Sequence, residues 1–250
     1  NMINFNNKIT LIAGGNSGIG YEIAETFLKY GSKVIILGRT NKKNILAVKS
    51  LRNKSNIDDI ISYNCDLSSE VSLLKVLKKI NKDHGKISFF VNCVGILSTK
   101  QIKKIDKKHI YNLHDNNFLP IVFGCKIVPK FMKKGVIVNF SSFAAEMPFE
   151  SGSIYGAYKS AAINFTKSAA AELIKKNIRV NIISPGLIDT PMNTRRIRNN
   201  KTTLFKSIAM NKAGKPSDIS GVALFLCSDY ASYITGENIV VSGGKYLIQS

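Results

Sequence analysis

A short apolar run that passes through glycines into an amphipathic helix constrains the N-terminal part of this chain most strongly. Residues 8–13 (Lys-Ile-Thr-Leu-Ile-Ala) form the run, a loop extends from Gly14 to Gly20, and apolar residues then recur at helical spacing up to Gly31. A helix that begins after such a loop presents unpaired N–H groups, and its dipole favours an anion. The pattern indicates a dinucleotide-binding turn, although an ordinary strand–helix turn can share it.

The positions of the glycines suggest separate roles. Gly14 allows a sharp exit from the strand, Gly18 lets the backbone approach a pyrophosphate, and Gly20 lets the helix pack on the sheet. The spacing is G-x-x-x-G-x-G, which differs from the G-x-G-x-x-G of most dinucleotide-binding folds. The candidate cofactor contacts in this loop are Gly14, Asn16, Ser17, Gly18, Ile19 and Gly20.

Further apolar runs alternate with helical patterns along the rest of the chain. They cover residues 34–37, 57–65, 87–94, 136–140, 180–183 and 239–241. This alternation predicts an α/β fold: one doubly wound, parallel, seven-stranded Rossmann-type sheet with helices on both faces. Residues 1–250 are expected to form a single domain, with the site at the carboxyl ends of the strands.

Tyr155 and Lys159 are four residues apart, so on a helix their side chains share one face. Proton transfer at neutral pH requires the tyrosine pKa to fall from about 10 to about 7, which amounts to about 4 kcal/mol. One cation at about 4 Å supplies about 4 kcal/mol at an effective dielectric of about 20. The pair therefore indicates an acid–base site in which Lys159 lowers the pKa of Tyr155, although Y-x-x-x-K also occurs by chance on solvated helices.

Together, the G-x-x-x-G-I-G loop and the Y-x-x-x-K pair resemble the short-chain dehydrogenase/reductase family, in its branch of about 250 residues. The resemblance covers nearly the whole chain and implies an NAD(P)-dependent oxidoreductase acting on a carbonyl or secondary alcohol. It assigns the catalytic residues as Asn117, Ser142, Tyr155 and Lys159, with no metal. It assigns further cofactor contacts to Asp66 and Leu67 at the adenine, Asn92 and Gly95 after the fourth strand, Tyr155 and Lys159, and Pro185, Gly186, Ile188 and Thr190 at the nicotinamide.

Two of these assignments have close competitors. Asn117, expected in the middle of a long fourth helix, competes with Asn116, and the apolar pattern that follows favours Asn117. Ser142 competes with Ser141, and the spacing to Tyr155 favours Ser142. Tyr158 is expected to pack against other side chains.

The second predicted strand bears on the choice of cofactor. It ends at Gly38, where an acid would bind the adenosine ribose of NAD, and Arg39 follows. An acid repels a 2′-phosphate, whereas a guanidinium pairs with one through its planar fork. NADP(H) is therefore expected in preference to NAD(H), with Thr40 and either Lys42 or Lys43 as further contacts, although basic residues also begin ordinary helices.

The sequence restricts the substrate less than the cofactor. A lid over the pocket is expected at about residues 190–210, where Arg195, Arg196 and Arg198 cluster. The cluster favours an anionic substrate, such as the 3-oxoacyl thioester of an acyl carrier protein, unless these charges contact only the cofactor or water. The alternatives are a sugar, steroid or small-ketone dehydrogenase, or a non-catalytic NADPH-binding regulator. The loop after Ser142 is expected to line the pocket with Glu146, Met147, Phe149 and Glu150.

The formal net charge of +20 does not by itself indicate nucleic-acid binding. Most of the 36 basic residues are lysines dispersed over predicted helices, without a groove-binding motif, so no nucleic-acid partner is expected. The four cysteines have no paired spacing, and no apolar stretch reaches the ~18 residues of a membrane span. We therefore expect a cytoplasmic protein that does not bind membranes. A homotetramer is expected through the helix of Tyr155, whose alanine-rich face allows close packing (Ala161, Ala162, Ala169, Ala170).

Overall fold

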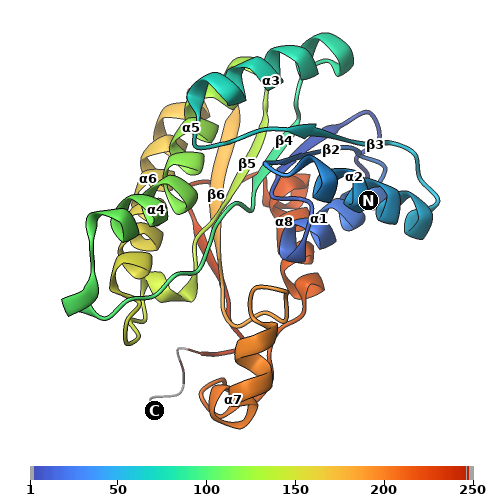
Figure 1. The fold of residues 1–250 in the computed structure, drawn as a ribbon. Coiled ribbons are helices and arrows are strands. Elements are labelled where there is room, and N and C mark those ends of the chain that lie inside the picture. The colour runs from blue at the N-terminus through green and yellow to red at the C-terminus, as the bar shows by residue number, and fades with distance from the viewer. Residues whose placement is uncertain (1–2, 246, 248–250) are drawn as a thin grey trace.

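A single parallel sheet organises the chain. The computed structural model describes residues 3–245 and residue 247. Its strands follow the order β3-β2-β1-β4-β5-β6-β7 (Figure 1), which confirms the predicted seven-stranded doubly wound sheet. The strands are β1 (Ile9–Ala13), β2 (Lys33–Gly38), β3 (Ile60–Asn64), β4 (Phe89–Asn92), β5 (Gly135–Phe140), β6 (Ile178–Pro185) and β7 (Asn238–Val241).

Helices cover both faces of this sheet (Figure 1). One face carries α1 (Gly18–Lys29), α2 (Asn41–Ser55) and α8 (Pro216–Cys227). The other carries α3 (Glu70–His84), α4 (Lys107–Asn117), α5 (Leu119–Ile127) and α6 (Ser153–Leu173). A further helix, α7 (Thr194–Lys206), projects from these layers, and none of its residues is buried.

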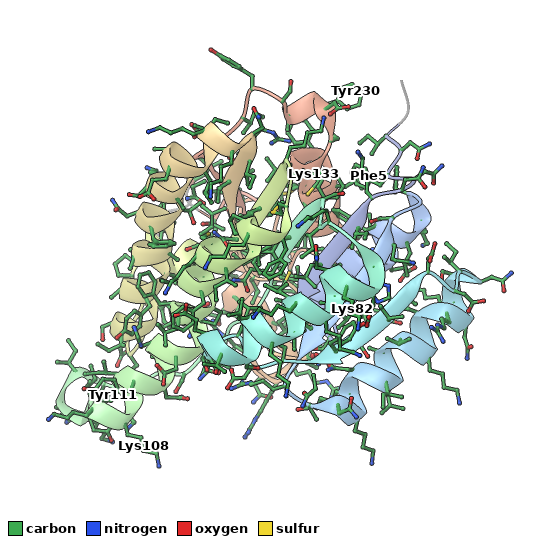
Figure 2. The ribbon with its side chains drawn as sticks, turned by 90° about the horizontal axis from the view of Figure 1, so that it is seen from above. Phe5, Lys82, Lys108, Tyr111, Lys133 and Tyr230 are labelled. Atoms are coloured by element: carbon green, nitrogen blue, oxygen red, sulfur yellow. The ribbon has the colours of Figure 1, made fainter. Side chains whose placement is uncertain are left out.

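Successive strand residues supply the two halves of the core, because side chains alternate between the faces of a strand. On β1, Leu11 packs in the cluster with α3, whereas Ile12 packs in the cluster with α1 and α8. Near the N-terminus, Phe5 (labelled in Figure 2) extends the cluster with α1 and α8. Its ring contacts those of Phe27 and Phe89, at centroid distances of 5.3 and 4.7 Å. Because both faces are covered, the central strands are apolar throughout.

The prediction of one long fourth helix is wrong, because the structure divides this segment into α4 and α5. Pro120 lies in the first turn of α5 and has no N–H to donate to the Asn116 carbonyl. In a continuous helix its ring would also clash with that carbonyl. Asn117 therefore ends α4 instead of lying in the middle of a helix. The third and fourth strands are also shorter than predicted, beginning at Ile60 and Phe89.

The alanine-rich face of α6 faces this chain's own interior. Ala162, Ala169 and Ala170 are buried in the monomer, and only Ala161 is partly exposed. These three alanines therefore cannot form the expected contact with a second copy, and the homotetramer stays a prediction that light scattering can test.

Exposed lysines lie on separate elements around the fold. Lys82 on α3, Lys108 on α4 and Lys133 before β5 mark three such places (Figure 2). Within residues 3–245 and 247, no helix combines the length and apolar character that crossing a membrane requires.

Candidate active site

A cleft of about 360 Å³ lies at the carboxyl ends of the strands, where β1 and β4 lead in opposite directions across the sheet. Its walls include the four assigned catalytic residues and, except for Asn92, the cofactor contacts assigned to the glycine loop and by the family resemblance. Asn92 is buried below the cleft, where its Nδ2 donates to the Pro120 carbonyl at 3.0 Å and holds the α4–α5 junction. Asn92 therefore lies where it supports the site without lining it.

The glycine loop presents the N-terminus of α1 to this cleft. Ser17 caps the helix without a side-chain hydrogen bond, so its hydroxyl does not occupy the first N–H groups of α1. A side chain at Gly20 would collide with the Gly14 carbonyl, so glycine is needed for the helix to pack this close to the loop. The loop and the helix dipole together form a cradle suited to phosphate groups.

Ser142, Tyr155 and Lys159 meet at the opposite side of the cleft. Ser142 follows β5, and its side chain lies near that of Tyr155, where it lowers the pKa of the phenol. Lys159 lies one turn after Tyr155 on α6, and its Nζ is 5.7 Å from the centroid of the tyrosine ring. The same Nζ donates to the Phe140 carbonyl at 3.2 Å, at the end of β5. The group therefore combines a phenol, a hydroxyl and a buried amine.

The structure separates the two competing serines. Ser141 Oγ donates to the backbone carbonyl of Lys159 at 2.7 Å, so it fastens α6 to the end of β5. Ser142 instead lies near Tyr155, and its Oγ accepts from the Ala144 N–H at 3.2 Å. Tyr158 packs on His114 and Phe118, as expected, at centroid distances of 5.5 and 6.2 Å.

The two asparagines also differ. Asn116 is hydrogen-bonded to the Asn112 carbonyl at the exposed surface of α4. Asn117 is fully buried, and its Oδ1 accepts from the Ile96 N–H at 3.2 Å. Gly95 lies between Asn117 and Lys159, because a Cβ there would be 3.0 Å from Asn117 Oδ1 and 3.3 Å from Lys159 Nζ. Asn117 is thus the asparagine near the amine.

Burial controls the ionisation of this group. It lowers the pKa of Lys159 to about 8 and raises the pKa of Tyr155 above its ordinary value, an effect that the neighbouring Ser142 hydroxyl partly offsets. The expectation that Lys159 lowers the pKa of Tyr155 is therefore wrong for this arrangement. The physical reason is that the amine faces the ring and bonds Phe140, while desolvation of the phenol dominates. Tyr155 consequently holds its proton at neutral pH.

An asparagine pair that sequence analysis missed lies at the opposite end of the cleft. Asn44 on α2 is fully buried, its Oδ1 accepts from Asn16 Nδ2 at 2.7 Å, and its Nδ2 donates to the Gly38 carbonyl at 2.9 Å. A Cβ at Gly38 would be 2.6 Å from Asn16 Nδ2 and would collide with Asn44 Oδ1. The pair therefore connects the glycine loop to the end of β2 and fills the space of a side chain at position 38.

The sequence did contain a signal for Asn44. It shares a helical face with Ala47 and Leu51, both buried, so it is a polar residue at a core position. Beside it, Arg39, Thr40 and Lys43 line the cleft, whereas Lys42 does not. Of the four residues expected from the loop after Ser142, Phe149 lines the cleft, whereas Glu146, Met147 and Glu150 do not. Phe143 and Ala144 of the same loop also line it.

Replacing Asn44 tests the asparagine pair. Asn44→Ala removes the three side-chain hydrogen bonds of Asn44, to Asn16, Gly38 and Tyr63, and leaves a small cavity. It should lower the free energy of unfolding by about 2 kcal/mol. Asn53→Ala, at an exposed position of the same helix, is the matched control and should change stability by less than about 1 kcal/mol. Urea unfolding of both variants measures the difference, and equal stabilities would contradict a structural role for the pair.

Lys159 gives stability a defined pH dependence. Its pKa is about 8 in the folded protein against an ordinary 10.5, so between these values the unfolded chain binds more protons and stability rises with pH. From pH 7 to 9 the wild-type protein should gain about 1 kcal/mol relative to Lys159→Met. Urea unfolding at the two pH values measures this change. A constant or reversed difference would show that folding does not lower the pKa of Lys159.

Comparison with known proteins relates this site to a family. A family model described as enoyl-(acyl carrier protein) reductase matches residues 13–245. The 3-oxoacyl-[acyl-carrier-protein] reductase FabG of Chlamydia pneumoniae is 32% identical over 241 residues, covering 95% of this chain and 96% of that protein. Carbonyl reductase family member 4 of Xenopus laevis is 32% identical over 243 residues, covering 96% and 98%.

A solved structure agrees with these relatives. The short-chain dehydrogenase/reductase (glucose/ribitol dehydrogenase) of Brucella melitensis superposes with a TM-score of 0.92 at 30% identity, covering 99% of this chain and all of that one. The similarity therefore extends over the sheet, the glycine loop and the cleft together.

Proposed function

Because the chain belongs to the short-chain dehydrogenase/reductase family of oxidoreductases, we propose that it interconverts a carbonyl and a secondary alcohol with NADP(H), using Tyr155 as the proton donor and acceptor. The observation that carries the proposal is the meeting of Ser142, Tyr155 and Lys159 in one cleft with the glycine cradle. For the substrate we propose a 3-oxoacyl thioester, supported by the reductases of acyl-carrier-protein thioesters among the similar proteins.

Each side chain of the group has a distinct task. Tyr155 gives its proton to the carbonyl oxygen in the reductive direction, and Ser142, which lies near Tyr155 in the cleft wall, donates to the same oxygen and stabilises its developing charge. The raised pKa of Tyr155 keeps the phenol protonated at neutral pH, which suits reduction. When bound, the nicotinamide cofactor supplies the hydride that this chemistry needs.

Lys159 and Asn117 support the tyrosine. The family resemblance assigns the Lys159 amine to the nicotinamide ribose and Asn117 to a proton path from that amine to solvent. The positions fit these tasks, because Gly95 leaves room between Asn117 Oδ1 and Lys159 Nζ. Since Lys159 has a pKa of about 8, it can exchange a proton near neutral pH.

The preference for NADP(H) is supported at the end of β2. Arg39 is exposed at the cleft wall beside Lys43, so both cations face the region of the adenosine ribose. An acidic side chain that would bind the unmodified ribose of NAD cannot be placed at position 38 without displacing Asn44 and Asn16. The chain therefore offers positive charge to a 2′-phosphate and has no space for the competing carboxylate.

Removing the phenol hydroxyl tests the catalytic assignment. Tyr155→Phe should lower kcat by at least about 100-fold, because it removes the proton donor, while NADPH binding measured by fluorescence changes little. Tyr158→Phe is the matched control, since Tyr158 packs against His114 and Phe118 and should keep most of the activity. A Tyr155→Phe variant that retained a tenth of the wild-type kcat would rule out the role of Tyr155 as the acid.

Removing the guanidinium tests the cofactor assignment. Arg39→Met should raise KM for NADPH by about tenfold or more and leave KM for NADH nearly unchanged, because only NADPH carries the 2′-phosphate. Lys42→Met, at a neighbouring position that does not line the cleft, should leave both values near wild type. A parallel rise of both KM values in Arg39→Met would instead assign Arg39 to the shared part of the cofactor.

A substrate assay tests the proposal as a whole. The protein should oxidise NADPH faster with acetoacetyl-CoA than with simple ketones. With acetoacetyl-CoA as the substrate, oxidation of NADH should be much slower than oxidation of NADPH. Tight NADPH binding without turnover of any carbonyl would retain the cofactor site and remove the proposed reaction.

A further inference from the structure

One buried side chain, that of Asn44, joins three separate segments beside the cleft. Asn44 is fully buried on α2, and its Oδ1 accepts from Nδ2 of Asn16 in the glycine loop at 2.7 Å. Its Nδ2 donates to the Gly38 carbonyl at the end of β2 at 2.9 Å, and to the Tyr63 carbonyl on β3 at 3.4 Å. The carbonyl oxygen and the amino group of this amide are therefore engaged within the protein, so they hold segments together instead of facing a ligand.

The segment that Asn44 holds carries a guanidinium in the cleft wall. Arg39 follows Gly38 directly, is exposed and lines the cleft. In residues 3–245 and 247, the Arg39 side chain forms no hydrogen bond and no ion pair. Its position therefore follows from the backbone at Gly38, whose carbonyl accepts from Asn44 and also from the Cys65 N–H at 3.1 Å.

The hydrogen bond between Asn16 and Asn44 also occupies the place of a side chain at position 38. A Cβ there would be 2.6 Å from Asn16 Nδ2 and would collide with Asn44 Oδ1. Gly38 is not one of the glycines with a positive φ, so its backbone conformation would accept a side chain. The two amides, and not the backbone, exclude an acid from the end of β2.

We propose that Asn44 selects the cofactor: it keeps an acid from position 38 and positions Arg39 for the 2′-phosphate of NADP(H). The inference rests on the proposed NADP(H)-dependent reaction and assigns its cofactor choice to a residue outside the cleft wall. Asn44 is thus a positioning residue that acts through Gly38 and Asn16. The preference should pass to NADH only when positions 38 and 44 are changed together.

Two substitutions and their combination test this assignment, with Kd values from fluorescence titration. Gly38→Asp alone should weaken the binding of NADPH and of NADH, because the new side chain collides with the two amides. Asn44→Ala alone should weaken NADPH binding by about tenfold and NADH binding much less, because Arg39 loses its fixed position. The double variant Gly38→Asp/Asn44→Ala removes the collision with Asn44, and it should bind NADH at least about tenfold more tightly than Gly38→Asp does.

A matched control and a reserve comparison keep the test decisive. Asn53→Ala, at an exposed position of α2, should leave both Kd values near wild type. If Gly38→Asp does not fold, the ratio of the two Kd values in the double variant is compared with that in Asn44→Ala, and it should move toward NADH.

Three outcomes would overturn the role of Asn44. One is a Gly38→Asp variant that gains NADH affinity by itself, and another is a double variant with no gain for NADH over its reference variant. The third is an equal loss of NADPH and NADH affinity in Asn44→Ala, because a residue that only stabilises the fold would weaken both cofactors alike.

Failure of the proposed function gives a different result. The titrations need no substrate, so a protein that reduces no carbonyl still yields every Kd. A wild-type protein that binds NADPH no more tightly than NADH would remove the proposed preference for NADP(H). Tighter NADH binding by the double variant than by Gly38→Asp would then still retain Asn44 as the residue that excludes an acid from position 38.

Discussion

The hydrogen bonds that join the end of β5 to α6 hold the candidate active site together. Ser141 Oγ donates to the Lys159 carbonyl at 2.7 Å, and Lys159 Nζ donates to the Phe140 carbonyl at 3.2 Å. Deeper in the same interface, Asn139 Nδ2 donates to Thr166 Oγ1 at 3.1 Å. Because Ser142 follows β5 and Tyr155 lies on α6, these bonds fix the position of the Ser142 hydroxyl relative to the Tyr155 hydroxyl.

The buried amine at this junction has a cost that the fold must offset. Desolvation of a charged lysine destabilises the folded state, and the lowered pKa of Lys159 expresses that cost. The surrounding sheet supplies the compensation, since both faces of β5 are covered by apolar clusters. The phenol and the buried amine thus lie next to a strand that contributes side chains to both apolar clusters.

The opposite end of the cleft uses a different device. There the backbone is fixed by amides, as Asn44 bonds the Gly38 carbonyl and the Asn16 side chain at once. This connects the glycine loop, which we propose holds the cofactor phosphates, to the segment of Arg39, which we propose favours NADP(H). The cleft therefore has one end held by amide hydrogen bonds and another that carries Tyr155 and Lys159. The basic α7 projects from the layers of the fold (Figure 1).

The sequence by itself determined the sheet, the glycine loop and the identity of the Tyr155–Lys159 pair, because periodicity and spacing are local properties of the chain. It also indicated Ser142 and Asn117, although it could not show that Ser141 fastens α6 or that the Asn116 side chain donates to the Asn112 carbonyl of its own helix. Only the tertiary structure decided that the pKa of Tyr155 is raised, that the helix breaks at Pro120 and that Asn44 connects the glycine loop to β2. It also decided that Arg196 is the arginine of the 195–198 cluster that lines the cleft. These depend on which groups distant in sequence exclude water or meet one another, and such contacts exist only once the chain has folded.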